Sequence, residues 1–207
     1  MSGEITNNMF RKDKQRDYFT DKAKQEGYPA RSVYKLKEID KKYNLIKPDD
    51  RVLDLGCAPG SWLIYLAQKI GDKGEVIGLD IGELKIDLKP NMKFIKQDIM
   101  LLADKDLENL GKFNAAVSDA APFTSGIRDL DTDRSFQISQ KAFDIAEKTL
   151  LAKGNFLCKI FESQDSHILM KQIEQKFDFV KIFRPRAVTK NSREIYIVAK
   201  GYKGRFF

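Results

Sequence analysis

The sequence predicts an α/β fold in which a seven-stranded, mostly parallel sheet with an antiparallel last strand carries helices on both faces. Short apolar segments alternate with segments of helical periodicity between residues 51 and 199. A glycine-containing turn, residues 56–60, joins the first apolar segment to one of these helices. Helical connections between successive strands are typical of parallel sheets, and only the last connection, residues 184–193, is too short for a helical crossover.

The predicted elements follow one another in a regular order. A helix begins at Ser32 and places Val33, Leu36, Ile39 and Tyr43 on one face. Strands are expected at about 51–55, 75–80, 93–97, 113–118, 155–161, 179–183 and 194–199. Further helices are expected from Gly60 to about 70, across 101–110, and at about 133–151 and 167–177. The loop between residues 120 and 133 is long and rich in small residues, which is typical of a functional loop.

Length and charge limit the possible classes of protein. The chain has 207 residues, enough for one hydrophobic core, and a formal net charge of +7 that favours a polyanionic partner. No apolar run approaches the length of a membrane span, and the first residues lack the apolar region of a signal peptide. We therefore expect a cytoplasmic protein with no membrane partner. No long apolar patch or heptad stands out, so we expect a monomer.

The N-terminal residues 1–29 are predicted to form a basic arm, and residues 30–207 a single domain. Between Arg11 and Lys24 the basic residues are interleaved with Tyr18 and Phe19. This composition suits either a solvated terminal arm or a flexible arm that contacts nucleic-acid phosphates and offers its aromatic rings for stacking.

Cysteine and histidine content argues against several kinds of site. If the fourth strand lies between the strands of Cys57 and Cys158, the two are about two strand spacings apart, roughly 9–10 Å, which is too far for a disulfide. With one histidine, His167, and no cysteine cluster, we expect no metal site. His167 follows a polar stretch and is expected to face solvent, so it does not suit a Ser-His-Asp hydrolase.

Four aspartates mark the expected ligand edge of the sheet. Asp54, Asp80, Asp98 and Asp119 lie at or just past the ends of four successive strands. In open α/β sheets, ligands bind outside this edge, and the position of Asp80 suits contact with ribose hydroxyls. The alternative is that each aspartate caps the next helix.

The glycine turn, residues 56–60, also indicates that a ligand binds at this edge of the sheet. Gly56 and Gly60 remove side chains where a ligand would approach the backbone. The turn lacks the G-x-G-x-x-G pattern, because Ala58 and Ser61 break it, and this argues against a dehydrogenase.

Lys159 is the residue that is hardest to explain as purely structural. It sits within the otherwise apolar segment 155–161. A buried ammonium costs several kcal/mol unless it is paired or its pKa falls, and a lysine with a lowered pKa is a candidate general base. Asp119 on the neighbouring strand is the expected partner, and Glu194 could lie on the far side. The alternative is that Lys159 extends to solvent from a strand end.

These residues resemble the FtsJ-like family of RNA ribose 2′-O-methyltransferases. The resemblance covers about residues 27–201 and rests on four motifs, which are Ala30-Arg31-Ser32-Val33-Tyr34-Lys35-Leu36, Asp54-Leu55-Gly56-Cys57-Ala58-Pro59-Gly60-Ser61-Trp62, Ser118-Asp119-Ala120-Ala121-Pro122 and Ser192-Arg193-Glu194-Ile195-Tyr196. It implies a Rossmann-like class I methyltransferase fold. Ser61 departs from relatives that carry a second glycine there, which implies a small effect on donor affinity.

The resemblance also implies roles for particular residues. The family's catalytic set falls on Lys35, Asp119, Lys159 and Glu194, although periodicity alone makes Lys35 an exposed lysine. The family's positions for S-adenosylmethionine fall on Gly60, Trp62, Asp80, Asp98 and Asp119. Asp54 and Gly56, at the end of the first strand and in the glycine turn, are also expected to contact this donor. Without the resemblance, Trp62 would be a packing residue. The RNA-binding residues are expected to be Arg31, Lys35, Arg184, Arg186, Lys190 and Arg193.

The expected reaction is methyl transfer to a ribose 2′-hydroxyl of RNA. The first-choice substrate is a uridine in large-subunit ribosomal RNA. Lys159, held by Asp119 and Glu194, would take or orient the hydroxyl proton. A transfer-RNA methyltransferase and an RNA-binding relative without catalysis are the alternatives, and a methyltransferase acting on protein or a small molecule would not need the four-residue set. An mRNA cap is a third possible RNA substrate.

Overall fold

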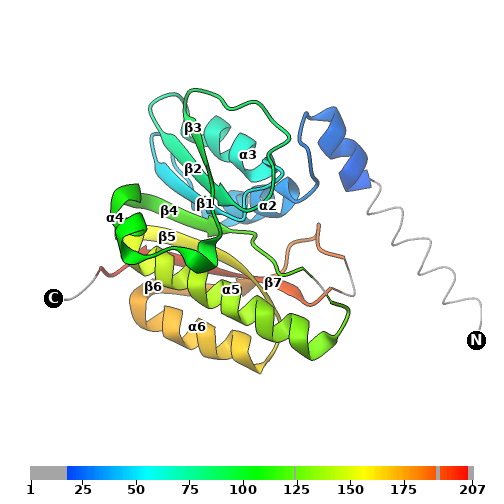
Figure 1. The fold of residues 1–207 in the computed structure, drawn as a ribbon, viewed down its shortest axis with the longest axis vertical. Helices are drawn as coiled ribbons and strands as arrows, with labels where there is room; N and C mark the ends of the chain where they lie inside the picture. The colour runs from blue at the N-terminus through cyan, green and yellow to red at the C-terminus, as the bar shows by residue number, and fades with distance from the viewer. Residues whose placement is uncertain (1–17, 124, 190–191, 205–207) are drawn as a thin grey trace, which may run out of the picture.

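A computed structural model describes residues 18–123, 125–189 and 192–204, and it confirms the predicted α/β fold. Within these residues, seven strands form one sheet in the order β3-β2-β1-β4-β5-β7-β6 (Figure 1). The strands are β1 (Arg51–Leu55), β2 (Glu75–Asp80), β3 (Met92–Lys96), β4 (Phe113–Ser118), β5 (Leu150–Phe161), β6 (Phe177–Phe183) and β7 (Glu194–Tyr202). Strands β1 to β5 pair in parallel, and β7 is antiparallel to both of its neighbours, β5 and β6.

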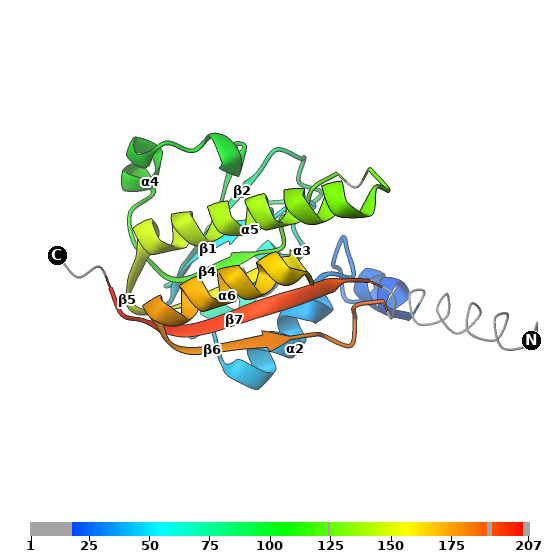
Figure 2. The ribbon, with the colours of Figure 1, turned by 90° about the horizontal axis from the view of Figure 1, so that it is seen from below.

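Helices cover both faces of the sheet, as predicted. The helices are α2 (Val33–Tyr43), α3 (Ser61–Ile70), the 3-10 helix η1 (Ile99–Leu101), α4 (Asp104–Leu110), α5 (Arg128–Thr149) and α6 (Gln164–Lys176). Figure 2 shows α4, α5 and α6 on one face of the sheet and α2 and α3 on the other. In the described part of the chain, no helix combines the length and apolar character that crossing a membrane requires.

Two predicted helices, one on each side of β4 in the sequence, have other bounds in the structure. Helix α5 begins at Arg128, about five residues earlier than expected. The Asp131 carboxylate accepts hydrogen bonds from the Ser125 amide, the Ser125 hydroxyl and the Gly126 amide, so it fixes the turn that starts the helix. The helix expected across 101–110 is divided into η1 and α4, and Leu101 is exposed because η1 ends there.

Strand β5 begins at Leu150, five residues before the expected start at 155. Its first residues pair with Phe113, and the register then shifts before Ala115 pairs with Asn155. Lys153 has a φ of 67°, so the chain bends there without leaving the sheet. Helix α6 begins at Gln164, where Ser163 accepts a hydrogen bond from the Ser166 amide and caps it.

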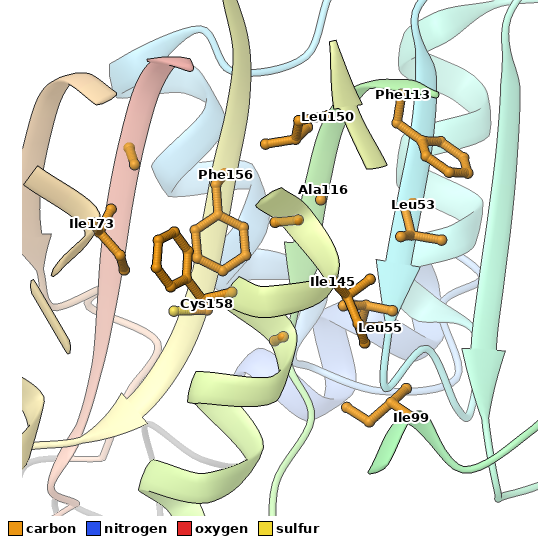
Figure 3. Packing of buried hydrophobic residues seen from close by; sticks show 14 of the residues in the cluster. Leu53, Leu55, Ile99, Phe113, Ala116, Ile145, Leu150, Phe156, Cys158 and Ile173 are labelled. Atoms are coloured by element: carbon orange, nitrogen blue, oxygen red, sulfur yellow. The ribbon is translucent and has the colours of Figure 1, made fainter. Parts of the chain in front are cut away.

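The core consists of two layers, one on each face of the sheet. Beneath α5 and α6, the rings of Phe143, Phe156 and Phe177 pack in series. Figure 3 shows Phe156 among the side chains of this layer. The layer beneath α2 and α3 contains Trp62 and Tyr196, whose ring centroids lie 6.3 Å apart. The two cysteines are buried and free, and β4 separates their strands as predicted.

The described part of the predicted N-terminal arm packs against the domain. Residues 18–25 are helical, and Ala23 and Tyr28 are buried beside Tyr34 of α2 and Ala187 of the connector between β6 and β7. The side chain of Lys37 lies 4.3 Å from the centroid of the Tyr28 ring. These residues therefore extend the domain, and a solvated arm does not describe them, because their aromatic side chains bury apolar area. Residues 1–17 lie outside the described part of the chain.

Asp40 fixes the turn between α2 and β1. Its carboxylate accepts hydrogen bonds from the amides of Leu45 and Ile46 and from the Tyr65 hydroxyl, and Lys69 lies 3.4 Å away. The Asp40→Ala substitution leaves these buried donors without an acceptor, so we expect the free energy of unfolding to fall by about 3 kcal/mol or more. Urea unfolding measures this change. The exposed Asp72→Ala control should stay within about 0.5 kcal/mol of wild type, and an equal effect of both substitutions would contradict the role of Asp40.

Candidate active site

A pocket of about 390 Å³ opens at the edge of the sheet where the parallel strands end. It lies where β1 and β4 meet, which is the point at which the strand order reverses. Three carboxylates line it, those of Asp80, Asp98 and Asp119. Its apolar lining includes Ile81, Ile99, Met100, Phe123 and Ile138. This is the edge at which the sequence pattern predicts a ligand, and ligand binding there stays a prediction.

The two carboxylates on the β2 and β3 side also organise the loops around them. Asp80 accepts hydrogen bonds from the amides of Ala58 and Gly82, at 2.8 and 2.7 Å. Asp98 accepts one from the amide of Met100 and caps η1, as the alternative interpretation of the aspartates expects. Carboxylate oxygens accept more than one hydrogen bond, so both residues can face a ligand while they hold these turns.

Gly56 lines the pocket, but the atoms closest to it belong to the loop after β4 and not to the space that a ligand could fill. It has a φ of 79°, and a Cβ there would lie 2.5 Å from the Ala120 Cα. The glycine is therefore required by the close approach of the loop after β4, a reason that the sequence does not reveal. Gly60 begins α3 with a φ of 112° and packs beside the Ile86 side chain, and it is not among the residues that line the pocket.

Two residues expected near the donor are placed behind the pocket wall. Trp62 is buried, packs on Tyr196 and donates a hydrogen bond to the Ser32 carbonyl, so its ring has the packing role that its helix position favours. Asp54 is fully buried in β1, and its carboxyl oxygens have no hydrogen-bond partner among the described residues. Burial, together with the nearby carboxylates of Asp119 and Asp80, raises the pKa of Asp54 well above its ordinary value.

The four residues of the expected catalytic set lie together beside this pocket. Lys159 Nζ lies 2.9 Å from Asp119 Oδ1 and also donates to the Asp119 carbonyl. Lys35 Nζ lies 2.6 Å from Glu194 Oε1. The expectation that Glu194 holds Lys159 therefore needs correction, because its ion pair is with Lys35. Lys159 is 7% exposed and does not extend to solvent, which excludes the alternative interpretation of this lysine.

Tyr196 joins the two ion pairs, and the sequence interpretation gave it no role. Its hydroxyl lies 2.7 Å from Asp119 Oδ1 and 2.9 Å from Glu194 Oε1. Residues two apart in a strand point to the same face of the sheet. The sequence therefore already indicates that the side chains of Tyr196 and Glu194 lie on one face. The ring is fully buried against Trp62, which holds the hydroxyl between the two carboxylates.

The charges of this network depend on one another. Burial disfavours ionisation of Asp119, but the ammonium groups of Lys159 and Lys35 overcome it and hold the pKa of Asp119 below its ordinary value. Burial likewise works against the Lys35 ammonium, yet the carboxylates of Asp119 and Glu194 raise the pKa of Lys35. Burial and the same two carboxylates raise the pKa of Tyr196. The network therefore favours two charged pairs bridged by a neutral tyrosine.

Helix α5 holds the backbone of β5 at the lysine. The Ser139 hydroxyl donates a hydrogen bond of 2.8 Å to the Lys159 carbonyl, and the Ser135 hydroxyl accepts one from the Phe161 amide. Both serines are buried, and Ile160, between the two contacts, is fully buried in the core layer beneath α5. The lysine side chain therefore starts from a rigid backbone.

The residues expected to bind RNA have varied surroundings. The Arg186 guanidinium is exposed and lies 3.9 Å from Glu38, while that of Arg184 lies 3.8 Å from Glu162. Arg31 is close enough to Lys35 to oppose its ionisation, and Lys35 itself is mostly buried in its ion pair. Lys190 lies outside the described residues.

Arg193 has a structural environment that the sequence did not suggest. Its guanidinium donates hydrogen bonds to the Thr132 hydroxyl and to the Arg128 carbonyl, and it lies 5.4 Å from the centroid of the Phe161 ring. Arg193 directly precedes Glu194 in the chain, so its hydrogen bonds connect the start of α5 with the start of β7, the strand that begins with Glu194.

Phe123 stands on the rim of the pocket and is 84% exposed. Such an exposed aromatic ring beside a site is typical of a surface that stacks on a ligand.

Among the residues that the structure describes, no group of three or more histidine, cysteine, aspartate or glutamate side chains could hold a metal ion.

Asp119 should make the stability of the protein depend on pH. Its folded-state pKa lies below the ordinary value of about 3.9, so its carboxylate contributes stability that is present above that pH and lost as pH falls through the folded-state pKa. We expect the difference in unfolding free energy between wild type and Asp119→Asn to be constant near neutral pH and to shrink below about pH 4. Urea unfolding at several pH values measures it, with the exposed Asp87→Asn as control. If the difference in unfolding free energy stays the same in acid, the lowered folded-state pKa of Asp119 is contradicted.

Comparison with known proteins identifies the family. The model of the FtsJ-like methyltransferase family matches residues 28–202. Proteins named ribosomal RNA large subunit methyltransferase E from Desulfatibacillum aliphaticivorans and Desulforapulum autotrophicum are each 43% identical, and the matches cover 91% and 90% of this chain and 92% and 93% of theirs. A Plasmodium falciparum structure described as a ribosomal RNA methyltransferase has a TM-score of 0.74 and 28% identity, over 86% of this chain and 100% of that one. The chain belongs to the FtsJ-like methyltransferase family.

Proposed function

We propose that this protein transfers a methyl group from S-adenosylmethionine to a ribose 2′-hydroxyl of large-subunit ribosomal RNA, most suitably on a uridine. The observation that carries the proposal is the pair of buried ion pairs, Lys159 with Asp119 and Lys35 with Glu194, beside the pocket. Asp119 belongs both to this network and to the pocket lining, so the two parts of the site meet at one residue.

The pocket residues fit the proposed donor. Asp80 offers acceptors for ribose hydroxyls, Asp98 offers one for the adenine edge, and Ile81 and Ile99 provide apolar surface for a flat base. When bound, S-adenosylmethionine supplies a methyl group already activated by its sulfonium. A fibrillarin from Aeropyrum pernix, crystallised with natively bound S-adenosyl-L-methionine, shares the fold, with a TM-score of 0.51 and 16% identity.

The lysines would act on the acceptor hydroxyl. A ribose hydroxyl is a weak nucleophile at neutral pH, so the protein must align it and accept its proton. Lys159 takes or orients this proton, and the Asp119 carboxylate, 2.9 Å from its Nζ, stabilises the ammonium form of the lysine. Lys35 orients the hydroxyl, held in place by Glu194. Tyr196 keeps the two carboxylates at a fixed separation.

The substrate assignment is supported by relatives named for the large ribosomal subunit and by the net charge of +7. Transfer RNA is the second candidate. A relative that binds RNA without catalysis is disfavoured, because all four residues of the set are present and paired. The monomeric state, the cytoplasmic location, the product S-adenosylhomocysteine and independence from metal stay predictions.

The Lys159→Ala substitution tests the reaction and the role of the lysine together. Labelled S-adenosylmethionine is incubated with transfer RNA, free ribosomal RNA and large ribosomal subunits from a strain that lacks the modification. We expect wild type to label one pool as ribose methylation, and the variant to be slower by roughly 100- to 10,000-fold, because it lacks the proton acceptor. Donor binding should persist in the variant. The exposed Lys171→Ala serves as a matched control and should keep wild-type activity.

The outcomes separate the parts of the proposal. Wild-type protein that binds the donor but labels no RNA pool would contradict the substrate assignment. A Lys159→Ala variant as active as wild type would contradict the mechanism while leaving the family unchanged.

The Asp80→Asn substitution tests the donor site. The amide keeps one of the two acceptors that hold the Ala58 and Gly82 amides, and it loses the other acceptor together with the charge that strengthens hydrogen bonds to ribose hydroxyls. We therefore expect donor affinity to fall roughly 10-fold. Isothermal titration measures the donor Kd, and RNA affinity should stay unchanged. The exposed Asp87→Asn provides the control, and equal donor affinity in Asp80→Asn and wild type would contradict the assignment.

A further inference from the structure

A second concave site lies at the opposite edge of the sheet from the candidate active site. It has a volume of about 470 Å³ and is lined by the end of α2, the bend in β5, and strands β6 and β7. Its charged lining consists of Lys47, Lys153, Lys200 and Asp178. None of these residues takes part in the donor pocket or the catalytic network.

The strand register gives the separation of the two sites. Lys200 pairs with Asn155 at one end of the β5 and β7 ladder, and Glu194 pairs with Phe161 at the other. Six residues of extended strand span about 20 Å. The second site is therefore too far away to contact the nucleotide held at Glu194, and it belongs to a more distant part of any bound molecule.

The charge of this site is positive. Asp178 is paired with Lys153, with Nζ 2.9 Å from Oδ2, so its charge is compensated within the site. Among the described residues, no carboxylate lies within 4.0 Å of Nζ of Lys47 or of Lys200. Lys200 donates to the Tyr43 carbonyl, which fixes its ammonium at the end of α2. Asp50 accepts a hydrogen bond from the Lys47 amide, and the charge of Lys47 favours ionisation of its carboxylate. The three lysines therefore face two carboxylates, those of Asp178 and Asp50, and an excess of positive charge remains.

Aromatic side chains adjoin the lysines. Phe179 lines the site, is 38% exposed, and lies 6.0 Å from the ring of Tyr43. The ring of Phe183 follows at 5.6 Å from Tyr43, with Lys42 Nζ 4.5 Å from its centroid. Tyr43 is the last residue of α2 and the two phenylalanines belong to β6, so these rings join the end of the helix to that strand. A basic groove with an exposed aromatic ring, here that of Phe179, is the combination that binds single-stranded nucleic acid, through phosphates and base stacking.

We propose that this site, formed by Lys47, Lys200 and Phe179, binds a single-stranded segment of the RNA substrate at a distance from the modified nucleotide. The inference rests on the proposed function for the identity of the polyanion. Lysines contact the phosphates and Phe179 stacks on a base, so the contact adds affinity without reading sequence. The site would thus help to select large, structured RNA over short fragments.

The test compares two double variants that lose the same charge. Lys47→Gln/Lys200→Gln alters the proposed site and keeps a hydrogen-bond donor at each position, while Lys105→Gln/Lys171→Gln alters exposed lysines on α4 and α6. Fluorescence anisotropy with a labelled single-stranded RNA of about 20 nucleotides gives Kd at several salt concentrations. For the site variant we expect a roughly 10-fold higher Kd, and a salt slope smaller by about 1.4, the loss expected for two phosphate contacts.

A further variant and a second readout locate the contact. Phe179→Leu should also weaken binding but leave the salt slope unchanged, because it removes stacking and no charge. At saturating RNA, methyl transfer by all three variants should match wild type, since none alters the catalytic network. Equal Kd and slope in the two double variants would overturn the proposal, and an acidic protein segment would then be the occupant to test. If wild type methylates no RNA while the binding difference persists, the proposed function fails and the RNA-binding site stands.

Discussion

The buried ion-pair network is the constraint on which the rest of the structure depends. Two lysines and two carboxylates are removed from water, and the cost of this desolvation is offset only when every charge has a partner at short distance. Lys159 with Asp119 and Lys35 with Glu194 meet this condition, and Tyr196 links them. Loss of one member leaves an uncompensated charge in the interior, so the chain segments that supply them must be held together.

The position and direction of β7 make this network possible. The strand lies between β5 and β6 and runs antiparallel to both, so its first residue, Glu194, lies at the edge where β4 and β5 end. A parallel β7 would place Glu194 at the opposite edge. Arg193 and the serines of α5 fix the neighbouring segments. Asp119 belongs both to the network and to the lining of the pocket.

Parts of the candidate site could be predicted from the sequence because they depend on patterns within short segments of the chain. Aspartates after successive strands marked the ligand edge, and a lysine in an apolar strand indicated a buried charge. The role of Lys35 came only from the family motif, since helical periodicity made it exposed. Tyr196 and Arg193 had no assigned structural role, because their partners are distant in the sequence: the Tyr196 hydroxyl meets Asp119 across 77 positions. The burial of Trp62 behind the pocket wall follows from packing against Tyr196.

The sequence by itself determined the fold class, the order of strands and helices and the edge of the sheet at which the pocket opens, because these depend on periodicity and on residues close in the chain. Only the tertiary structure decided that Glu194 pairs with Lys35, that Ala120 requires Gly56, and that residues 18–29 pack on the domain. These outcomes depend on which strands become neighbours and how closely their loops approach. A local pattern does not encode such distances, because they arise when separate segments bury their apolar surfaces against one another.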